Sequence, residues 1–202
     1  MIIYEDNHLL ALNKPAGILT QPSGTSQKNL EEIGKSLIQT KFLEAVHRLD
    51  KPVSGVVLFA KTKKALSRLQ EAMREKQTKK IYLAAVSGNP PNDEVLTHFL
   101  LKGEHKTRVV TSKTPGAKKA ILHLRKKDHL LEIELITGRY HQIRAQLSHI
   151  GCPIIGDVKY GSPVKLKEDI IALHHQTLHL VHPVQLSPLT LEAPLPPYFP
   201  KN

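Results

Sequence analysis

The chain has 202 residues, 40% of them hydrophobic, and its 29 Lys and Arg against 18 Asp and Glu give a net charge of +11 and a pI near 9.7. This length allows one large domain or two small ones, and the charge favours a polyanionic partner, with nucleic acid as the default. No apolar run is long enough to span a membrane, the acidic start does not fit a secretory signal, and the single Cys152 excludes a disulfide framework. We therefore expect a soluble intracellular protein.

The first half of the chain predicts two strands and two helices. A strand at Leu9–Asn13 ends in the turn residues Lys14 to Gly17, and Ser26 is expected to cap the helix that follows. The run Val56–Ala60 is short, apolar and bounded by Ser54-Gly55, which predicts a buried strand. A second helix is expected over 63–77. Its cations form either an RNA-facing stripe or, more commonly, a solvated face: Lys63, Lys64, Arg68 and Arg74.

Strand patterns dominate the second half. Strands are expected at Ile81–Val86, Thr107–Thr111, Lys119–Leu124, Leu130–Ile136 and Thr177–Val181, and a helix at Tyr140–Ile150. A proline-rich tail follows the last strand. Because strands and helices do not alternate as βαβ units, the pattern predicts an α+β fold on a largely antiparallel sheet. No linker divides the chain, so residues 1–202 are expected to form one domain or two tightly packed subdomains.

Asp50 is the first candidate for chemistry, because it lies in the loop that leads into the buried strand at Val56–Ala60. The neighbours His47, Arg48 and Lys51 would keep its carboxylate ionised if they converge on it in the fold. The alternative is an ordinary turn residue, since Asp before Lys51-Pro52 suits a turn.

Tyr82 and two arginines complete the candidates from the residues alone. Tyr82 alternates with Ile81 and Leu83 in a strand and faces either the core or a cleft. Arg139 and Arg144 are five residues apart, so on a helix they diverge, and one can meet a buried carboxylate while the other meets phosphate.

The histidines do not predict a metal site. His175 and His179 have the i, i+4 spacing of a helical metal pair, but they lie in a predicted strand. His141 and Gln142, at the start of a predicted helix, either bind phosphate or cap structure. No glycine-rich nucleotide loop or cysteine-pair zinc signature is present.

Five blocks in order resemble the RluA family of RNA pseudouridine synthases and span almost the whole chain. They are NKPAGILTQP, HRLDKPVSGVVLFAKT, KKIYLAAVSG, TGRYHQIRAQLSHIGCPIIGDVKYG and LHHQTLHLVHP. The chain departs from the family at Val53, Gln146 and His175, where Thr, His and Ala are usual. The chain starts at what resembles the catalytic domain, so we expect no S4-like RNA-binding domain and recognition by the catalytic domain itself.

The resemblance implies a pseudouridine synthase fold with a central catalytic cleft, and it implies site residues. Asp50 would be the catalytic aspartate, Tyr82 would stack on the target base, and Arg139 would pair with Asp50. Arg48 would occupy the space left by a flipped nucleotide. The other expected RNA contacts are His47, Lys14, Lys51, His141, Gln142 and Arg144.

The expected activity is conversion of specific uridines in ribosomal or transfer RNA to pseudouridine by a cytoplasmic, monomeric enzyme. The reaction exchanges an N1–C1′ bond for a C5–C1′ bond without net redox change, so we expect no cofactor and no metal. Two alternatives stay open: a catalytically silent RNA-binding protein, which the charge supports equally, and a base-releasing glycosidase, which generally uses two carboxylates.

Overall fold

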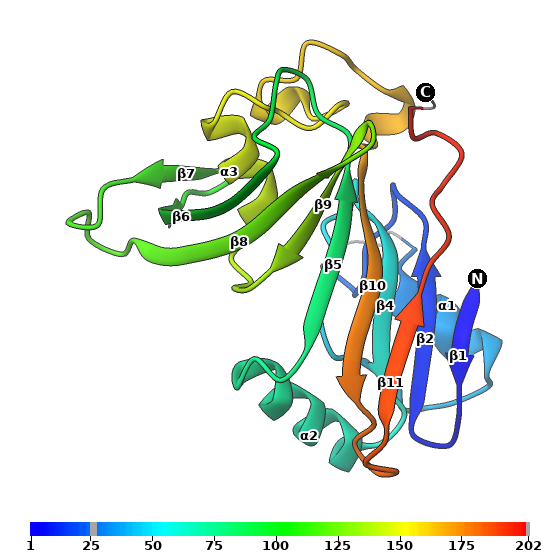
Figure 1. The fold of residues 1–202 in the computed structure, drawn as a ribbon. Coiled ribbons are helices and arrows are strands. Elements are labelled where there is room, and N and C mark those ends of the chain that lie inside the picture. Colours follow the sequence, from blue (N-terminus) through cyan, green and yellow to red (C-terminus); the bar gives the residue numbers. More distant parts are fainter. Residues whose placement is uncertain (25–27, 201–202) are drawn as a thin grey trace. The chain divides into compact units, whose positions relative to one another are not determined.

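The protein is described here by a computed structural model that covers residues 1–24 and 28–200, and its chain divides into two compact units. The first unit combines two segments that are distant in the sequence, Met1–Lys80 and His174–Pro196. The second contains Ile81–Leu173 and the residues from Pro197 on. Figure 1 shows the strands and helices of each unit in sequence colours.

The strands of the first unit lie in the order β1, β2, β4, β10, and two strands pair off this path, β11 with β10 and β3 with β4. β4 and β10 are parallel, and the other pairs are antiparallel. The bounds are β1 Ile2–Glu5, β2 Leu9–Lys14, β3 Glu44–Ala45, β4 Ser54–Ala60, β10 Leu173–Val181 and β11 Pro188–Glu192. All seven residues of β4 are buried, which explains why its sequence is a continuous apolar run.

Two capped helices belong to the first unit. Helix α1 (Leu30–Leu37) begins after Asn29, whose side chain accepts a hydrogen bond from the amide of Glu32 at 3.0 Å. Helix α2 (Lys63–Arg74) begins after Thr62, whose hydroxyl accepts from the amide of Ala65 at 3.2 Å. Asn29 is therefore the cap of α1, and the expected cap Ser26 lies outside the described residues.

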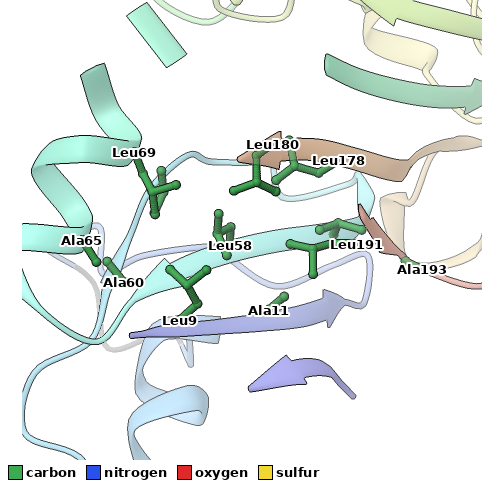
Figure 2. Close-up of a cluster of buried hydrophobic side chains, with 12 residues drawn as sticks. Leu9, Ala11, Leu58, Ala60, Ala65, Leu69, Leu178, Leu180, Leu191 and Ala193 are labelled. Atoms are coloured by element: carbon green, nitrogen blue, oxygen red, sulfur yellow. The ribbon is translucent and has the colours of Figure 1, made fainter. Parts of the chain in front are cut away.

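A cluster of buried aliphatic side chains packs α2 against the strands of the first unit (Figure 2). Alternate residues of a strand share a face, and residues four apart share a face of a helix, so each element contributes regularly spaced side chains. The labelled pairs are Leu9 and Ala11 on β2, Leu58 and Ala60 on β4, Ala65 and Leu69 on α2, Leu178 and Leu180 on β10, and Leu191 and Ala193 at β11. Each fully buried leucine contributes roughly 1.5–3 kcal/mol to folding.

Gly55 permits the close approach of β4 and β10. Its φ is +117°, and a Cβ atom there would lie 2.2 Å from the backbone oxygen of His175, its partner on β10. No other residue fits both constraints. β4 includes Ser54 and Gly55 and so begins two residues before the expected run Val56–Ala60.

The strands of the second unit are antiparallel throughout and lie in the order β5, β9, β8, β6, β7. Their bounds are β5 Lys79–Ala84, β6 Asp93–Lys102, β7 Thr107–Val110, β8 Lys118–Lys127 and β9 Leu130–Leu135. Helix α3 (Gln142–His149) packs through Ala145 against Leu100 and Ala120 of the strands. Two short 3-10 turns, η1 (Val158–Tyr160) and η2 (Lys167–Asp169), follow it. None of the helices in the described part of the chain combines the length and apolar character needed to cross a bilayer.

The expected α+β class with a mostly antiparallel sheet is confirmed, but four strands were not predicted. The longest of them, β6, has ten residues, and its burial does not alternate cleanly because Val95 is 58% exposed. β3 has only two residues. β11 lies inside what was expected to be a proline-rich tail, and β1 is a four-residue strand with no fully buried position.

Candidate active site

Asp50 lies in a tight turn just before β4, as the sequence predicts. The amide of Val53 donates to the carbonyl of Asp50 at 3.0 Å, which closes the turn. The preceding residue, Leu49, is buried, whereas Asp50 is partly exposed. The backbone before Asp50 is therefore anchored in the core through Leu49, while the Asp50 side chain reaches the surface in part.

The segment that follows β2 holds the Asp50 turn from both sides. The Thr20 hydroxyl donates to the carbonyl of Leu49 at 3.0 Å and accepts from its amide at 3.1 Å. The carbonyl of Lys51 accepts from the amide of Gly17 at 2.8 Å and from the ammonium of Lys14 at 3.2 Å. These contacts join two of the sequence blocks that the family resemblance singled out.

Lys14 is a buried part of the turn and not a surface cation. Its side chain is fully buried, and its ammonium also donates to the carbonyls of Pro15 at 3.1 Å and Ile18 at 2.8 Å. Burial lowers the pKa of Lys14 to about 7, while the negative charge of Asp50 acts in the opposite direction. The expectation that Lys14 contacts RNA does not fit this position, because all three of its N–H donors face carbonyls.

His47 also turns inward, whereas Arg48 and Lys51 are exposed. The Nε2 atom of His47 accepts from the amide of Leu58 at 3.2 Å, and its ring packs edge-on against His175 at 5.3 Å. Burial, followed by the charges of Lys80 and His175, holds the pKa of His47 well below its usual range. A neutral, inward imidazole is unsuited to binding phosphate, so Arg48 and Lys51 are the candidates that reach solvent here.

His175, whose ring packs against His47, and its neighbour His174 lie on β10 and are fully buried. Nε2 of His174 donates to the carbonyl of Ala193 at 3.2 Å, which leaves its Nδ1 to accept from the hydroxyl of Ser54 at 2.8 Å. Nδ1 of His175 donates to the carbonyl of Val56 at 2.7 Å. Burial lowers the pKa of both, that of His175 to about 3.

Replacing His175 by Ala is expected to flatten the acid dependence of stability. The folded protein binds this proton only near pH 3, whereas the unfolded chain binds it near 6.5, so the free energy of unfolding falls as the pH drops through this window. One such group contributes a slope of up to about 1.4 kcal/mol per pH unit. Urea unfolding between pH 3.5 and 7 measures the change, with the exposed His105→Ala as control. Equal slopes in both variants would contradict the assignment.

Tyr82 lies in the second unit, on β5. It pairs with Ile133 of β9 and is 6% exposed, between the buried Ile81 and Leu83. The flanking residues are as buried as Tyr82, so strand alternation alone does not separate a core face from a site face at this position.

The turn between β9 and α3 carries Arg139, and Gln142 holds that turn. The Gln142 side-chain oxygen accepts from the Arg139 amide at 3.0 Å and from the Thr137 hydroxyl at 2.8 Å. Its amide nitrogen donates to the carbonyl of Ile121 at 3.0 Å. Arg139 itself is exposed, and its Nε donates to the carbonyl of Lys119 at 3.1 Å. The buried Gln142 thus supports the backbone, and a direct RNA contact does not fit its 3% exposure.

His141 adopts a left-handed conformation with φ of 53° at the start of α3. Its ring stacks on Tyr140 at 3.9 Å, and its Nδ1 lies 2.9 Å from the hydroxyl of Tyr160. That hydroxyl accepts from the amide of Thr107 at 2.8 Å, so its own proton is available to His141. His141 is 9% exposed, which favours a structural role over the expected phosphate contact.

Arg144 is the buried arginine of this unit. It is 5% exposed, and its Nε and one terminal nitrogen donate to the two carboxylate oxygens of Asp157 at 2.7 and 2.9 Å. The guanidinium also lies 4.9 Å from the centre of the Tyr160 ring. Two further structural residues, Asp157 and Tyr160, were not among the candidates from the sequence; the signal available for them was the Asp and Tyr of the segment GDVKYG.

The candidate residues thus fall into two sets. Asp50, Lys14, His47 and Lys51 lie in the first unit, and Tyr82, Arg139 and Arg144 in the second. In the first unit, hydrogen bonds hold the turn that carries Asp50. In the second unit, Gln142 holds the turn that carries Arg139, and Arg139 is exposed whereas Arg144 is buried.

A family model described as RNA pseudouridylate synthase matches residues 8–149, which include Asp50, Tyr82 and Arg139. The chain belongs to this family. The ribosomal large subunit pseudouridine synthase C of Buchnera aphidicola subsp. Baizongia pistaciae is 35% identical over 96% of the chain and 67% of that protein. A ribosomal large subunit pseudouridine synthase D of Xylella fastidiosa is 34% identical over 96% of the chain and 66% of its own length.

Solved structures of pseudouridylate synthases have the same fold. Human RNA pseudouridylate synthase domain containing 4 matches with a TM-score of 0.80 and 28% identity, over 98% of this chain and 89% of that one. Human RNA pseudouridylate synthase domain containing 1 also matches with a TM-score of 0.80, but at 21% identity this likeness supports the fold alone. The chain spans about two thirds of the length of its bacterial relatives.

Proposed function

We propose that the protein converts specific uridines of large-subunit ribosomal RNA to pseudouridine. The proposal rests on the position of Asp50, which lies inside the region that matches the family. Its turn, just before β4, is held on both sides by hydrogen bonds from Thr20 and Lys14. The names of the relatives support ribosomal RNA as the substrate. We also propose that the enzyme acts in the cytoplasm as a monomer. It should need no cofactor, because the isomerisation moves one glycosidic bond without net oxidation.

In this proposal the ionised carboxylate of Asp50 acts at the target nucleotide. It attacks C1′, stabilises a cationic sugar, adds to C6 of the ring, or removes the 2′ hydrogen, and each route needs a charged oxygen in a site poor in water. Tyr82 stacks on the uracil ring and is the candidate to accept the C5 proton after the ring rejoins C1′.

An arginine is proposed to pair with Asp50, and two are candidates. The family resemblance favours Arg139. The contacts within the second unit favour Arg144 as a second candidate, because it is buried and its guanidinium is orientated by Asp157. Under this alternative the exposed Arg139 is suited to phosphate.

RNA binding is proposed to involve a basic arm, defined as residues 102–127 from the end of β6 through β7 and β8. The arm has nine Lys and Arg against one Glu, a net charge of +8 out of +11 for the chain, and all nine cations are exposed. In Figure 1 the loop between β7 and β8 lies at the left-hand end of the second unit. Helix α2, by contrast, mixes its cations with Glu71, and its Arg68 donates to the carbonyl of Pro183 at 2.7 Å.

Neutralising the arm is expected to weaken RNA binding in a salt-dependent way. The triple variant Arg108→Ala, Lys113→Ala, Lys118→Ala should reduce the slope of log Kobs against log salt by about 0.7–0.9 for each phosphate that these side chains neutralise, so by up to roughly 2–3. Filter binding between 50 and 300 mM KCl measures this. The matched control on α2 is Lys63→Ala, Lys64→Ala, Arg74→Ala. A larger change of the slope in the control variant would indicate that the RNA binds at α2 and not at the basic arm. Unchanged slopes in both variants would refute the electrostatic account.

The proposed function is tested by tritium release from RNA containing 5-tritiated uridine. An active synthase replaces the C5 hydrogen, so release should match the pseudouridine found after digestion to nucleosides. A silent RNA-binding protein predicts neither product, and a glycosidase predicts free uracil. Mapping pseudouridines in ribosomal and transfer RNA from cells with and without the gene identifies the substrate, and loss confined to transfer RNA would refute the ribosomal assignment.

A further inference from the structure

Three consecutive peptide groups around Asp50 are each held by a hydrogen bond. The Leu49 carbonyl accepts from Thr20, the Asp50 carbonyl from the amide of Val53, and the Lys51 carbonyl from Gly17 and Lys14. Fixing the peptide planes on both sides of a residue fixes its φ and ψ, and hence the direction in which its side chain leaves the backbone. The aspartate therefore leaves the backbone in a set direction.

Thr20 makes the bonds that hold the N-terminal side of this turn. One buried oxygen, Oγ1, both donates to the Leu49 carbonyl and accepts from the Leu49 amide, which only a hydroxyl can do at a single atom. The Thr20 backbone is anchored separately, because its carbonyl accepts from the amide of Glu31 at the start of α1 at 3.1 Å. The side chain can therefore be altered while its backbone stays in place.

We propose that Thr20 is a positioning residue, whose hydroxyl sets the direction of the Asp50 carboxylate during the reaction. The inference rests on the proposed function, in which Asp50 reacts with the target uridine. Without the hydroxyl, the buried amide and carbonyl of Leu49 lose their partners, and the turn must shift to satisfy them. A displacement of about 1 Å at a reacting group can cost about 100-fold in rate.

The deciding comparison is Thr20→Val, which keeps the shape and removes the hydroxyl, against Thr20→Ser, which keeps the hydroxyl. Thr20→Val should lower the single-turnover rate at saturating protein by about 10- to 100-fold, with the Kd for RNA within about twofold of the parent. Thr20→Ser should stay within about threefold of the parent rate. The control Thr62→Val makes the same chemical change at the cap of α2 in the same unit, and should lower the Tm without changing the rate.

Amide hydrogen exchange tests the same bonds without reference to activity. The Leu49 amide should exchange faster in Thr20→Val than in the parent or Thr20→Ser. Unchanged exchange overturns the inference even in a protein that does not act on RNA. Absence of tritium release from the parent, together with faster Leu49 exchange in Thr20→Val, refutes the proposed function instead.

Lys14→Met provides a second test from the other side of the turn, in case Thr20→Val does not fold. Met removes the cost of desolvating the ammonium but leaves the carbonyls of Pro15, Ile18 and Lys51 without this donor, so thermal unfolding is measured together with the rate. The variant removes one donor to Lys51, and its rate should fall at least about fivefold at unchanged RNA affinity. Parent-like rates in Lys14→Met and Thr20→Val, or an equal loss in Thr62→Val, overturn the proposal.

Discussion

Asp50→Asn is expected to lower the single-turnover rate of pseudouridine formation by at least about 10³-fold. Asn has nearly the same size and shape but no negative charge, so it cannot attack C1′, stabilise a cationic sugar or accept a proton. The hydrogen bonds that hold the carbonyls of Leu49, Asp50 and Lys51 are made by the backbone of the turn, and Asn at position 50 can keep them. The fold and RNA affinity should therefore survive the change.

Tritium release and nucleoside analysis measure this effect, with RNA binding and thermal unfolding measured in parallel. The matched control is Glu44→Gln, which removes the charge of an exposed carboxylate on β3 in the same unit and should leave the rate within about twofold. Equal release by Asp50→Asn and the parent would eliminate Asp50 as the catalytic group. Loss of RNA binding along with activity would instead assign Asp50 to binding.

Arg144→Met is expected to destabilise the protein by about 3–5 kcal/mol. The Asp157 carboxylate is 1% exposed, and its two oxygens accept from Arg144, so removing the guanidinium leaves a buried charge without its partner. The double variant Arg144→Met, Asp157→Asn removes both charges and should recover most of the missing stability. Urea unfolding measures the three free energies of unfolding.

The same double variant separates the two arginines proposed to pair with Asp50. If Arg144 is the partner, the stable double variant stays inactive, and Arg139→Gln keeps most of its rate. If Arg139 is the partner, Arg139→Gln loses activity with a change in stability below about 0.5 kcal/mol, because the side chain is exposed. Recovery of activity in the double variant then accompanies recovery of stability.

The place of Asp50 could be predicted from the sequence because its signal is local. A continuous apolar run after a turn identifies β4, and the aspartate precedes it by four residues. The inward direction of Lys14 could not be predicted in this way, since it depends on carbonyls of residues 18 and 51 that only the fold brings together. The basic composition of the chain favoured a surface position for Lys14, whereas in the structure its side chain is buried and its ammonium donates to three carbonyls.

The second unit shows the same limit. Helix α3 could be predicted from Ile143 and Leu147, but the assignment of roles to Arg139 and Arg144 depends on Asp157, which lies thirteen residues beyond Arg144 in a segment without regular periodicity. The strand β6 was missed because polar and apolar residues occur on both of its faces, so its sequence does not alternate between them. Local pattern specifies elements, whereas the partners of buried polar groups are set by contacts distant in the sequence.

The parallel pairing of β4 with β10 also affects how the protein is made. β4 is synthesised well before its parallel neighbour β10, which together with β11 comes from residues 173–192. The first unit therefore cannot close on the ribosome until residues 173–192 have emerged, and its folding includes a contact that spans more than half of the 202 residues. The strand that follows Asp50 can pair with β2 and β3 long before its parallel partner β10 is translated.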